Sequence, residues 1–166
     1  MELARQTLGG TVEFSVAPID PEINWVARSL EGLAPVIAGG FYVYGSHETG
    51  PVPGGLTPMK IDAAQAFGTG HHETTTGCLE AIDKVLKRRK PRHMIDVGTG
   101  TGLLAFAALH LWPKAYATAS DIDPVAVEVT AENAAINGVP LGDGPGQLAL
   151  AAAPGMEHPL LIGRAP

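Results

Sequence analysis

Hydrophobic positions along the second half of the chain fall into short runs separated by longer helical stretches. Residues 94–97 are apolar apart from one aspartate and lead directly into Gly98, Gly100 and Gly102. A segment rich in leucine and alanine, 103–109, follows at once. An apolar run, a glycine-rich turn and a helix-forming segment in this order predict a buried strand joined to a helix.

Two more apolar runs, 115–120 and 148–152, predict two further strands. Between them Asp123-Pro124 provides a helix N-cap and a first-turn proline, so we expect a helix over 125–137 that ends at Gly138. Strands that alternate with helices are typical of a parallel sheet. The sequence therefore predicts an α/β protein.

The pattern before residue 93 is weaker and predicts mainly short elements. A glycine- and proline-rich loop at 46–55 separates two of them. The expected elements are a strand at 11–16, a helix from Asp20 to Gly32, strands at 41–44 and 60–63, and a helix that is capped by Thr74 or Thr75, ends in the cations 87–90 and is stopped by Pro91. We place an N-terminal extension and linker with one helix at 1–57, and a ligand-binding domain at 58–166.

Composition removes several classes of function. The 166-residue chain carries a formal net charge of -6, which argues against a general nucleic-acid-binding protein. Its single cysteine, Cys78, excludes an internal disulfide framework and fits a reducing, cytoplasmic location. The sequence contains no 18-residue apolar span and no charged-then-apolar leader, so we expect neither a membrane helix nor a signal peptide.

The spacing of the glycines limits the ligand that the turn can bind. A glycine-rich strand-to-helix turn can offer backbone N–H groups and a helix N-terminus to a ligand. The dinucleotide pattern G-x-G-x-x-G/A requires a small residue where Leu103 stands, and no Lys-Ser/Thr pair completes a phosphate-binding loop. The remaining pattern is D-x-G-x-G-x-G, from Asp96 to Gly102.

An acidic residue at the end of the next strand favours a nucleoside. Asp121 follows the apolar run 115–120, and a carboxylate there can accept hydrogen bonds from both ribose hydroxyls. The alternative is an ordinary strand-to-helix turn that binds nothing.

Three stretches carry a family resemblance. D-V-G-T-G-T-G at 96–102 and S-D-I-D-P at 120–124 resemble the first two motifs of class I S-adenosylmethionine-dependent methyltransferases. A-F-G-T-G-H-H-E-T-T at 66–75 is similar to the A-F-G-T-G-x-H-x-T-T signature of the PrmA-type enzymes, which methylate a stalk-base protein of the large ribosomal subunit. Asn133, Asn137 and Gly138 match the E-N-A-x-x-N-G helix end of that family.

The resemblance implies a Rossmann-like class I methyltransferase sheet with helices on both faces, S-adenosyl-L-methionine as cofactor and no metal. It implies that the glycines lie near the methionine end of the cofactor, that Asp121 holds the ribose and that Ile122 packs against the adenine. The implied cofactor-binding residues are Phe67, Gly68, Thr69, His72, Asp96, Gly98, Thr99, Gly100, Gly102, Asp121 and Ile122. His72 is also the candidate for removing the proton from the acceptor amine. The alternative is that His72 orders its own loop by hydrogen bonding.

The sequence departs from the family pattern in two places. The part before residue 25 is much shorter than the family's substrate-recognising domain. The asparagine motif of the fourth strand and all later strands are missing, so we expect a C-terminally truncated chain with an exposed hydrophobic sheet edge.

These observations lead to three hypotheses. The first is a protein N-methyltransferase that acts on a ribosomal protein, with no direct contact to nucleic acid or membrane. The second is a fragment that binds S-adenosylmethionine without transferring the methyl group, or a methyltransferase with another acceptor; such a fragment can complete its sheet as a homodimer. The third, a nicotinamide oxidoreductase, is disfavoured by Leu103.

Overall fold

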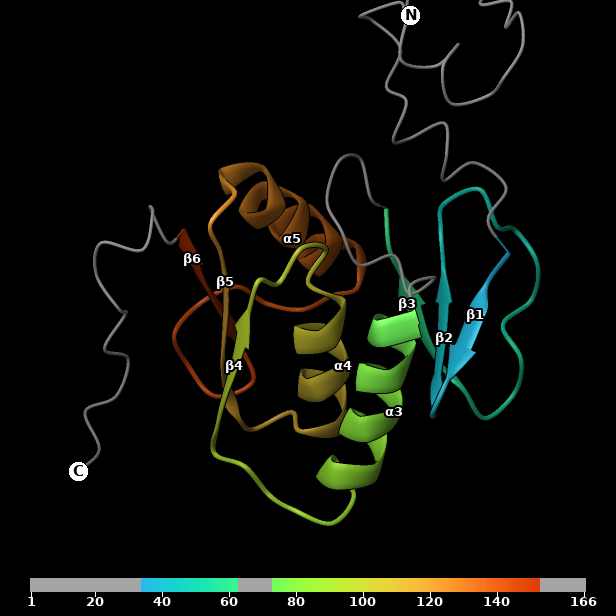
Figure 1. Ribbon diagram of the computed structural model, residues 1–166, viewed down its shortest axis with the longest axis horizontal. Helices are drawn as coiled ribbons and strands as arrows, with labels where there is room; N and C mark the ends of the chain where they lie inside the picture. The colour runs from blue at the N-terminus through green and yellow to red at the C-terminus, as the bar shows by residue number, and fades with distance from the viewer. Residues whose placement is uncertain (1–33, 63–72, 153–166) are drawn as a thin grey trace, which may run out of the picture.

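The computed structural model of the protein describes residues 34–62 and 73–152. Two three-stranded sheets lie on either side of a helical layer (Figure 1). The first sheet has the order β1-β2-β3 and the second β4-β5-β6. The elements are β1 (Val36–Ala38), β2 (Phe41–Tyr44), β3 (Thr57–Lys60), α3 (Glu73–Leu86), β4 (His93–Val97), α4 (Leu103–Leu111), β5 (Tyr116–Asp121), α5 (Pro124–Ile136) and β6 (Leu148–Ala152).

The first sheet combines an antiparallel and a parallel pair. β1 and β2 form a tight hairpin in which Ala38 pairs with Phe41. β3 runs parallel to β2 after a connection over residues 45–56, and Phe41 pairs with Thr57. β3 contains Pro58, which is compatible with a strand here because β3 is the edge of this sheet.

The second sheet is entirely parallel. β4 pairs with β5, and β5 pairs with β6, so that Asp96, Ala119 and Leu150 lie side by side. The carboxyl ends of the three strands therefore meet at one edge of the sheet, where an open α/β sheet normally binds its ligands.

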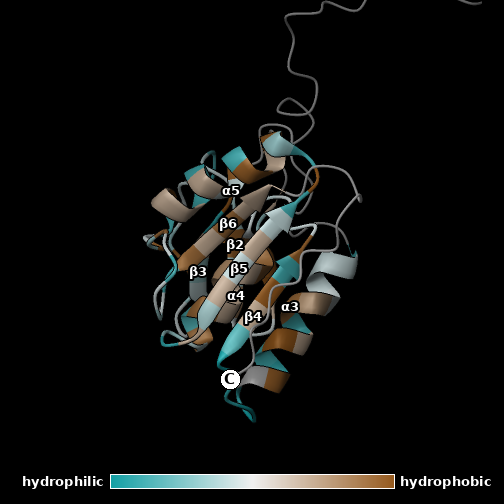
Figure 2. Cartoon of the chain, turned by 90° about the vertical axis from the view of Figure 1, so that its left-hand side faces the viewer, coloured by the Kyte–Doolittle hydropathy of each residue, from teal (hydrophilic) through white to brown (hydrophobic). Residues whose placement is uncertain are grey.

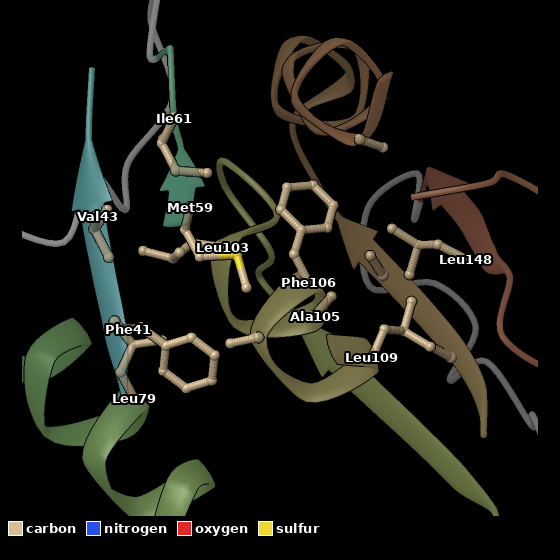
Figure 3. Packing of buried hydrophobic residues seen from close by; sticks show 14 of the residues in the cluster. Phe41, Val43, Met59, Ile61, Leu79, Leu103, Ala105, Phe106, Leu109 and Leu148 are labelled. Carbon is tan, nitrogen blue, oxygen red and sulfur yellow. The ribbon is translucent and has the colours of Figure 1, made fainter. Parts of the chain in front are cut away.

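α4 lies between the two sheets (Figure 1), and its sequence explains why. The helix is apolar on nearly every side, as is typical of a helix buried all round. Phe106 and Leu103 are each about 1% exposed and pack with residues of both sheets, such as Met59 and Leu148 (Figure 3). This shared core fixes the first sheet against the second.

The two faces of the second sheet differ in burial. Ala119 and Leu148 are fully buried on the face that α4 and α5 cover. On the opposite face, Ile95 is 52% exposed and Val97 80% exposed. Figure 2 views this second face, with the strands in front of α4. Helices were expected on both faces, and the described helices that contact this sheet cover one of them.

Three local predictions require correction, and two lie outside the described residues. α3 spans Glu73–Leu86, so Thr74 and Thr75 lie within the helix and are not its caps, and the cations 87–90 follow the helix instead of forming its last turn. The strand expected at 60–63 is β3 at Thr57–Lys60, and β1 was not predicted. The strand at 11–16 and the helix from Asp20 to Gly32 are outside the described part of the chain.

The α/β fold and the strand–turn–helix order from residue 93 onward are as predicted. The proposed domain boundary after residue 57 falls inside β3, which belongs to the first sheet. Within the described ranges, no helix has the length and apolar character needed to cross a membrane.

Candidate functional site

The glycine turn between β4 and α4 lies at the carboxyl edge of the parallel sheet. The amides of Gly98 and Thr99 both donate to the carbonyl of Ser120, at 2.8 and 3.0 Å. The amide of Gly102 donates to the carbonyl of Thr99 at 3.0 Å. The turn is thus tied to β5 and closed on itself by its own main chain.

The side chain of Asp121 connects the end of β5 to the same turn. Its Oδ2 accepts a hydrogen bond from the amide of Gly100 at 2.9 Å, and its Oδ1 accepts one from the amide of Asp123 at 3.0 Å. Each carboxylate oxygen has two lone pairs, so both oxygens keep acceptor capacity for hydroxyl groups of a ligand. Asp121 is half-buried, which leaves it accessible at the sheet edge.

These contacts correct one expectation about the turn. Backbone N–H groups were expected to face a ligand, yet four of them, at residues 98, 99, 100 and 102, donate to acceptors within the protein. A phosphate-binding turn requires N–H groups directed at the phosphate. The turn is therefore better suited to a ligand without a phosphate at this position.

Asp96 lies behind the turn and connects it to α4. Its Oδ2 accepts a hydrogen bond from the Thr99 hydroxyl at 2.9 Å, and its carboxyl also accepts one from the amide of Ala105. The N-cap of α4 is Gly102, which has no side chain to cap the helix, so Asp96 satisfies one of the free amides.

Burial raises the pKa of Asp96 above its ordinary value of 3.8. The hydrogen bonds from Thr99 and Ala105 favour the charged form and offset part of this rise, whereas the negative charge of Asp121 adds to it. The two carboxyls thus lie on the two sides of one turn, and the charge of Asp121 acts on Asp96.

Two glycines of the turn are required for different reasons. Gly102 has a φ of +84°, and a Cβ there would lie 2.4 Å from the ring of Phe106 and 2.8 Å from Cγ2 of Thr130. Gly102 is therefore a packing position in the interior. Gly98 has a φ of +73°, and no atom of the described residues lies within 4 Å of an added Cβ, so Gly98 borders space that those residues leave open.

The structure brings seven of the predicted residues together at this edge, namely Asp96, Gly98, Thr99, Gly100, Gly102, Asp121 and Ile122. Ile122 is 65% exposed and follows Asp121 directly, so it offers an apolar surface beside the carboxylate. Phe67, Gly68, Thr69 and His72 lie outside the described residues.

Sequence reasoning missed a set of buried polar residues on α5. Thr130 and Asn133 are fully buried, and both donate hydrogen bonds to carbonyls of the glycine turn. The available signal was the placement of Asn133 among alanines inside a predicted helix, where asparagine is an unfavourable residue. It was interpreted only as part of a helix end.

A groove lies behind the turn, along the edge of β4. This groove of about 530 Å³ lies between α3, β4 and α4 and is lined mainly by apolar side chains such as Ile82, Val85 and Met94. Among the described residues that line it, Asp96 is the one acidic side chain. An apolar groove does not suit a ribose or a charged amino-acid group, so the turn remains the candidate site.

The groups that the site offers are suited to a nucleoside. A carboxylate, an exposed isoleucine and a glycine bordering open space provide hydrogen-bond acceptors for hydroxyls and an apolar surface for a base. No cluster of three or more metal-ligating side chains occurs among the residues that the structure describes.

Comparison with known families supports this assignment. The sequence model described as "Ribosomal protein L11 methyltransferase (PrmA)" matches residues 2–150. The chain belongs to this family. The match includes both the glycine turn and Asp121 as well as the segment 63–72.

Relatives in this family are about half identical to the chain. The ribosomal protein L11 methyltransferase of Allorhizobium ampelinum is 50% identical over 144 residues, which are 84% of this chain and 49% of that protein. The enzyme of Mesorhizobium japonicum is 46% identical over 164 residues, which are 99% of this chain and 53% of that protein. The chain thus spans about half the length of the curated relatives that it matches.

A solved structure shares the fold. The crystal structure of the ribosomal protein L11 methylase from Lactobacillus delbrueckii subsp. bulgaricus superposes with a TM-score of 0.55 and 32% sequence identity. The superposition covers 69% of this chain and 54% of that chain. The PrmA-type class I methyltransferase sheet predicted from the sequence is thereby confirmed.

Proposed function

We propose that this chain binds S-adenosylmethionine at the glycine turn and forms the cofactor-binding part of a protein N-methyltransferase. The observation that carries the proposal is the hydrogen bond between Asp121 and the amide of Gly100. This bond holds the Asp121 carboxylate, which can accept from ribose hydroxyls, against a turn in which the preceding glycine, Gly98, borders space that the described residues leave open.

Each described residue of the site contacts a different part of the proposed cofactor or holds the turn in shape. Asp121 accepts hydrogen bonds from the ribose, and the exposed Ile122 packs on the adenine. The open space at Gly98 accommodates the methionine end, while Asp96 and Thr99 hold the turn in shape. S-adenosylmethionine supplies a methyl group on a sulfonium, so the protein needs mainly to align it and exclude water.

Phe67, Gly68, Thr69 and His72 complete the proposed site on the strength of the sequence signature. A neutral amine must lose a proton when it gains the methyl group, and His72 is the candidate base for that step. Asparagine in place of His72 removes the base while keeping a hydrogen-bonding side chain. It should reduce transfer and leave cofactor binding unchanged if His72 acts on the proton, and reduce both if His72 orders its loop.

The acceptor that we propose is an amino group of a ribosomal protein. The relatives are named as methyltransferases of ribosomal protein L11, and the family match covers the cofactor site of this chain. Action on a cytoplasmic ribosomal protein is consistent with the single cysteine, Cys78, which is free and exposed.

A second candidate is cofactor binding without methyl transfer. It is favoured by β4, which is the edge strand of the second sheet among the described residues and can pair with a second copy. The nicotinamide alternative is disfavoured because the turn amides already donate within the protein.

A methyl-transfer assay with isotope-labelled S-adenosylmethionine and purified ribosomal protein L11 separates the two candidates. Transfer of label to amino groups of the acceptor supports the enzyme, and binding without transfer supports the second candidate. Asp121→Asn should reduce transfer at low cofactor concentration. Asp143→Asn is the matched control, because it removes the same charge from an exposed residue that precedes β6, at the opposite end of the sheet.

A further inference from the structure

α5 has a polar face that points into the protein. Thr130, Asn133 and Asn137 are spaced so that they lie on one side of the helix. Thr130 and Asn133 are 0% exposed. Every buried side-chain nitrogen and oxygen among the described residues has a hydrogen-bond partner. Every polar atom of this buried face therefore has a hydrogen-bond partner, and the partners show which segments α5 holds in place.

One set of partners is the main chain of the glycine turn. The Thr130 hydroxyl donates to the carbonyl of Gly100 at 3.0 Å, and Nδ2 of Asn133 donates to the carbonyl of Thr101 at 3.0 Å. The C=O and N–H of a trans peptide point in opposite directions, so fixing a carbonyl also fixes the plane of its peptide. α5 therefore sets the orientation of two consecutive peptides in the turn.

The other set of partners is the end of β3. Oδ1 of Asn133 accepts a hydrogen bond from the amide of Asp62 at 3.0 Å. Asp62 lies two residues after β3, and Asn137 binds the last residue of the strand itself, because it accepts from the amide of Lys60 at 2.9 Å and donates to the carbonyl of Lys60 at 2.7 Å. Two asparagines thus attach the first sheet to α5.

Asn133 is the residue that belongs to both sets. We propose that Asn133 is a positioning residue whose single carboxamide bridges the glycine turn and the end of β3, so that the placement of the first sheet determines the geometry of the cofactor-binding turn. Nδ2 of Asn133 donates to the carbonyl of Thr101 while its Oδ1 accepts from the amide of Asp62.

The connection continues beyond Asp62. The carboxyl of Asp62 accepts a hydrogen bond from the amide of Ser46 at 2.8 Å and another from the Ser46 hydroxyl. A chain of hydrogen bonds therefore runs from the loop after β2, through Asp62 and Asn133, to the glycine turn. The Ser46 end of this chain is exposed, whereas the bonds of Thr130 and Asn133 to the turn are buried, and satisfied buried bonds favour one arrangement over alternatives.

A pair of asparagines allows a matched test. Asn133→Ala removes the bonds to both the turn and β3, whereas Asn137→Ala removes bonds to β3 but none to the turn. The measurements are the amide NMR resonances of Gly98 and Gly100 in the full chain and the calorimetric Kd for S-adenosylhomocysteine. The resonances test the positioning alone, and the Kd rests in addition on the proposed function.

We expect Asn133→Ala to shift both glycine resonances and to weaken S-adenosylhomocysteine binding about tenfold, the effect of one lost buried hydrogen bond. Asn137→Ala should lower thermal stability but leave both readouts near wild type. Equal changes in the two variants, or unchanged glycine resonances in a folded Asn133→Ala protein, overturn the proposal. If the wild-type chain binds no S-adenosylhomocysteine, the proposed function fails while the resonances still decide the role of Asn133.

Asn133→Ser keeps a polar group in the buried site and replaces the alanine variant if that variant does not fold.

A measurement on the wild-type chain needs no substitution. The amides of Asp62 and Gly102 should exchange with solvent through one common opening, because the Asn133 bridge joins the two segments. Separate openings of the two amides contradict the bridge.

Discussion

The carboxylate of Asp121 at the end of β5 accepts a hydrogen bond of 2.9 Å from the amide of Gly100 in the neighbouring turn. On the other side of the turn, Asp96 accepts from Thr99 and from the first turn of α4. The glycine turn is therefore held between two carboxyls, one half-buried at the ligand edge and one directed at the helix.

The pKa of Asp96 tests this arrangement, because one variant should lower it and another should raise it. The pKa of Asp96 is raised above 3.8 mainly by burial, and the charge of Asp121 adds to the rise. Asp121→Asn should lower the pKa of Asp96, whereas Thr99→Ala should raise it further because a hydrogen bond to the charged form is lost. Carboxyl-carbon NMR titrations measure both shifts, and shifts of the same sign would contradict the geometry.

The raised pKa of Asp96 also predicts how stability depends on pH. The folded chain binds this proton more tightly than the unfolded chain does. The contribution of Asp96 to the free energy of unfolding should therefore fall as pH rises from 3.8 through the raised pKa, and stay constant above it. Urea unfolding of wild type and Asp96→Asn across this range isolates the contribution. A loss of stability with falling pH that depends on Asp96 would reverse the assignment.

Alanine substitutions at two glycines should separate packing from binding. Gly102→Ala places a Cβ against Phe106 and Thr130, so we expect a loss of about 2–3 kcal/mol in the free energy of unfolding. Gly98→Ala meets open space and should cost only about 1 kcal/mol of backbone strain. It should still weaken S-adenosylmethionine binding, because the new methyl group enters the proposed cofactor space. Urea unfolding and calorimetry measure the two effects, and equal stability losses would contradict the packing role of Gly102.

Substitutions on the two faces of the second sheet should differ sharply. Leu148→Ala, at a position that is 0% exposed, should cost about 2–5 kcal/mol in the free energy of unfolding. Val97→Ala, at a position that is 80% exposed, should change it by about 0.5 kcal/mol or less. Urea unfolding gives both values. A large loss at Val97 would show that the face seen in Figure 2 is covered in solution.

The sequence was most informative where local chemistry fixes the structure. Asp123 caps α5 by accepting from the amide of Val125, and Pro124 begins the helix, as their order predicts. The alternation of strands and helices likewise identified the parallel sheet. β1 was not predicted because three residues beside a Gly-Gly hairpin carry no periodic pattern. β3 was misplaced because Pro58 argues against a strand unless the strand is known to lie at an edge.

The site was predictable to a similar extent. The positions of Asp96, the glycines and Asp121 follow from the motif and from the rule that parallel strands end at one edge. The internal use of the turn amides depends on the distance from Gly100 to Asp121, and the bridge through Asn133 depends on how β3 docks against α5. Both are long-range contacts, which a local pattern does not encode.

Calorimetric titration of the 166-residue chain with S-adenosylmethionine tests the central claim most directly. We predict saturable binding at one site, weakened about tenfold or more in Asp121→Asn because a hydrogen bond to a charged acceptor is lost, and unchanged in Asp143→Asn. NAD+ should show no comparable binding. A folded chain that binds no S-adenosylmethionine, or binds it equally well with Asp121→Asn, would contradict the account.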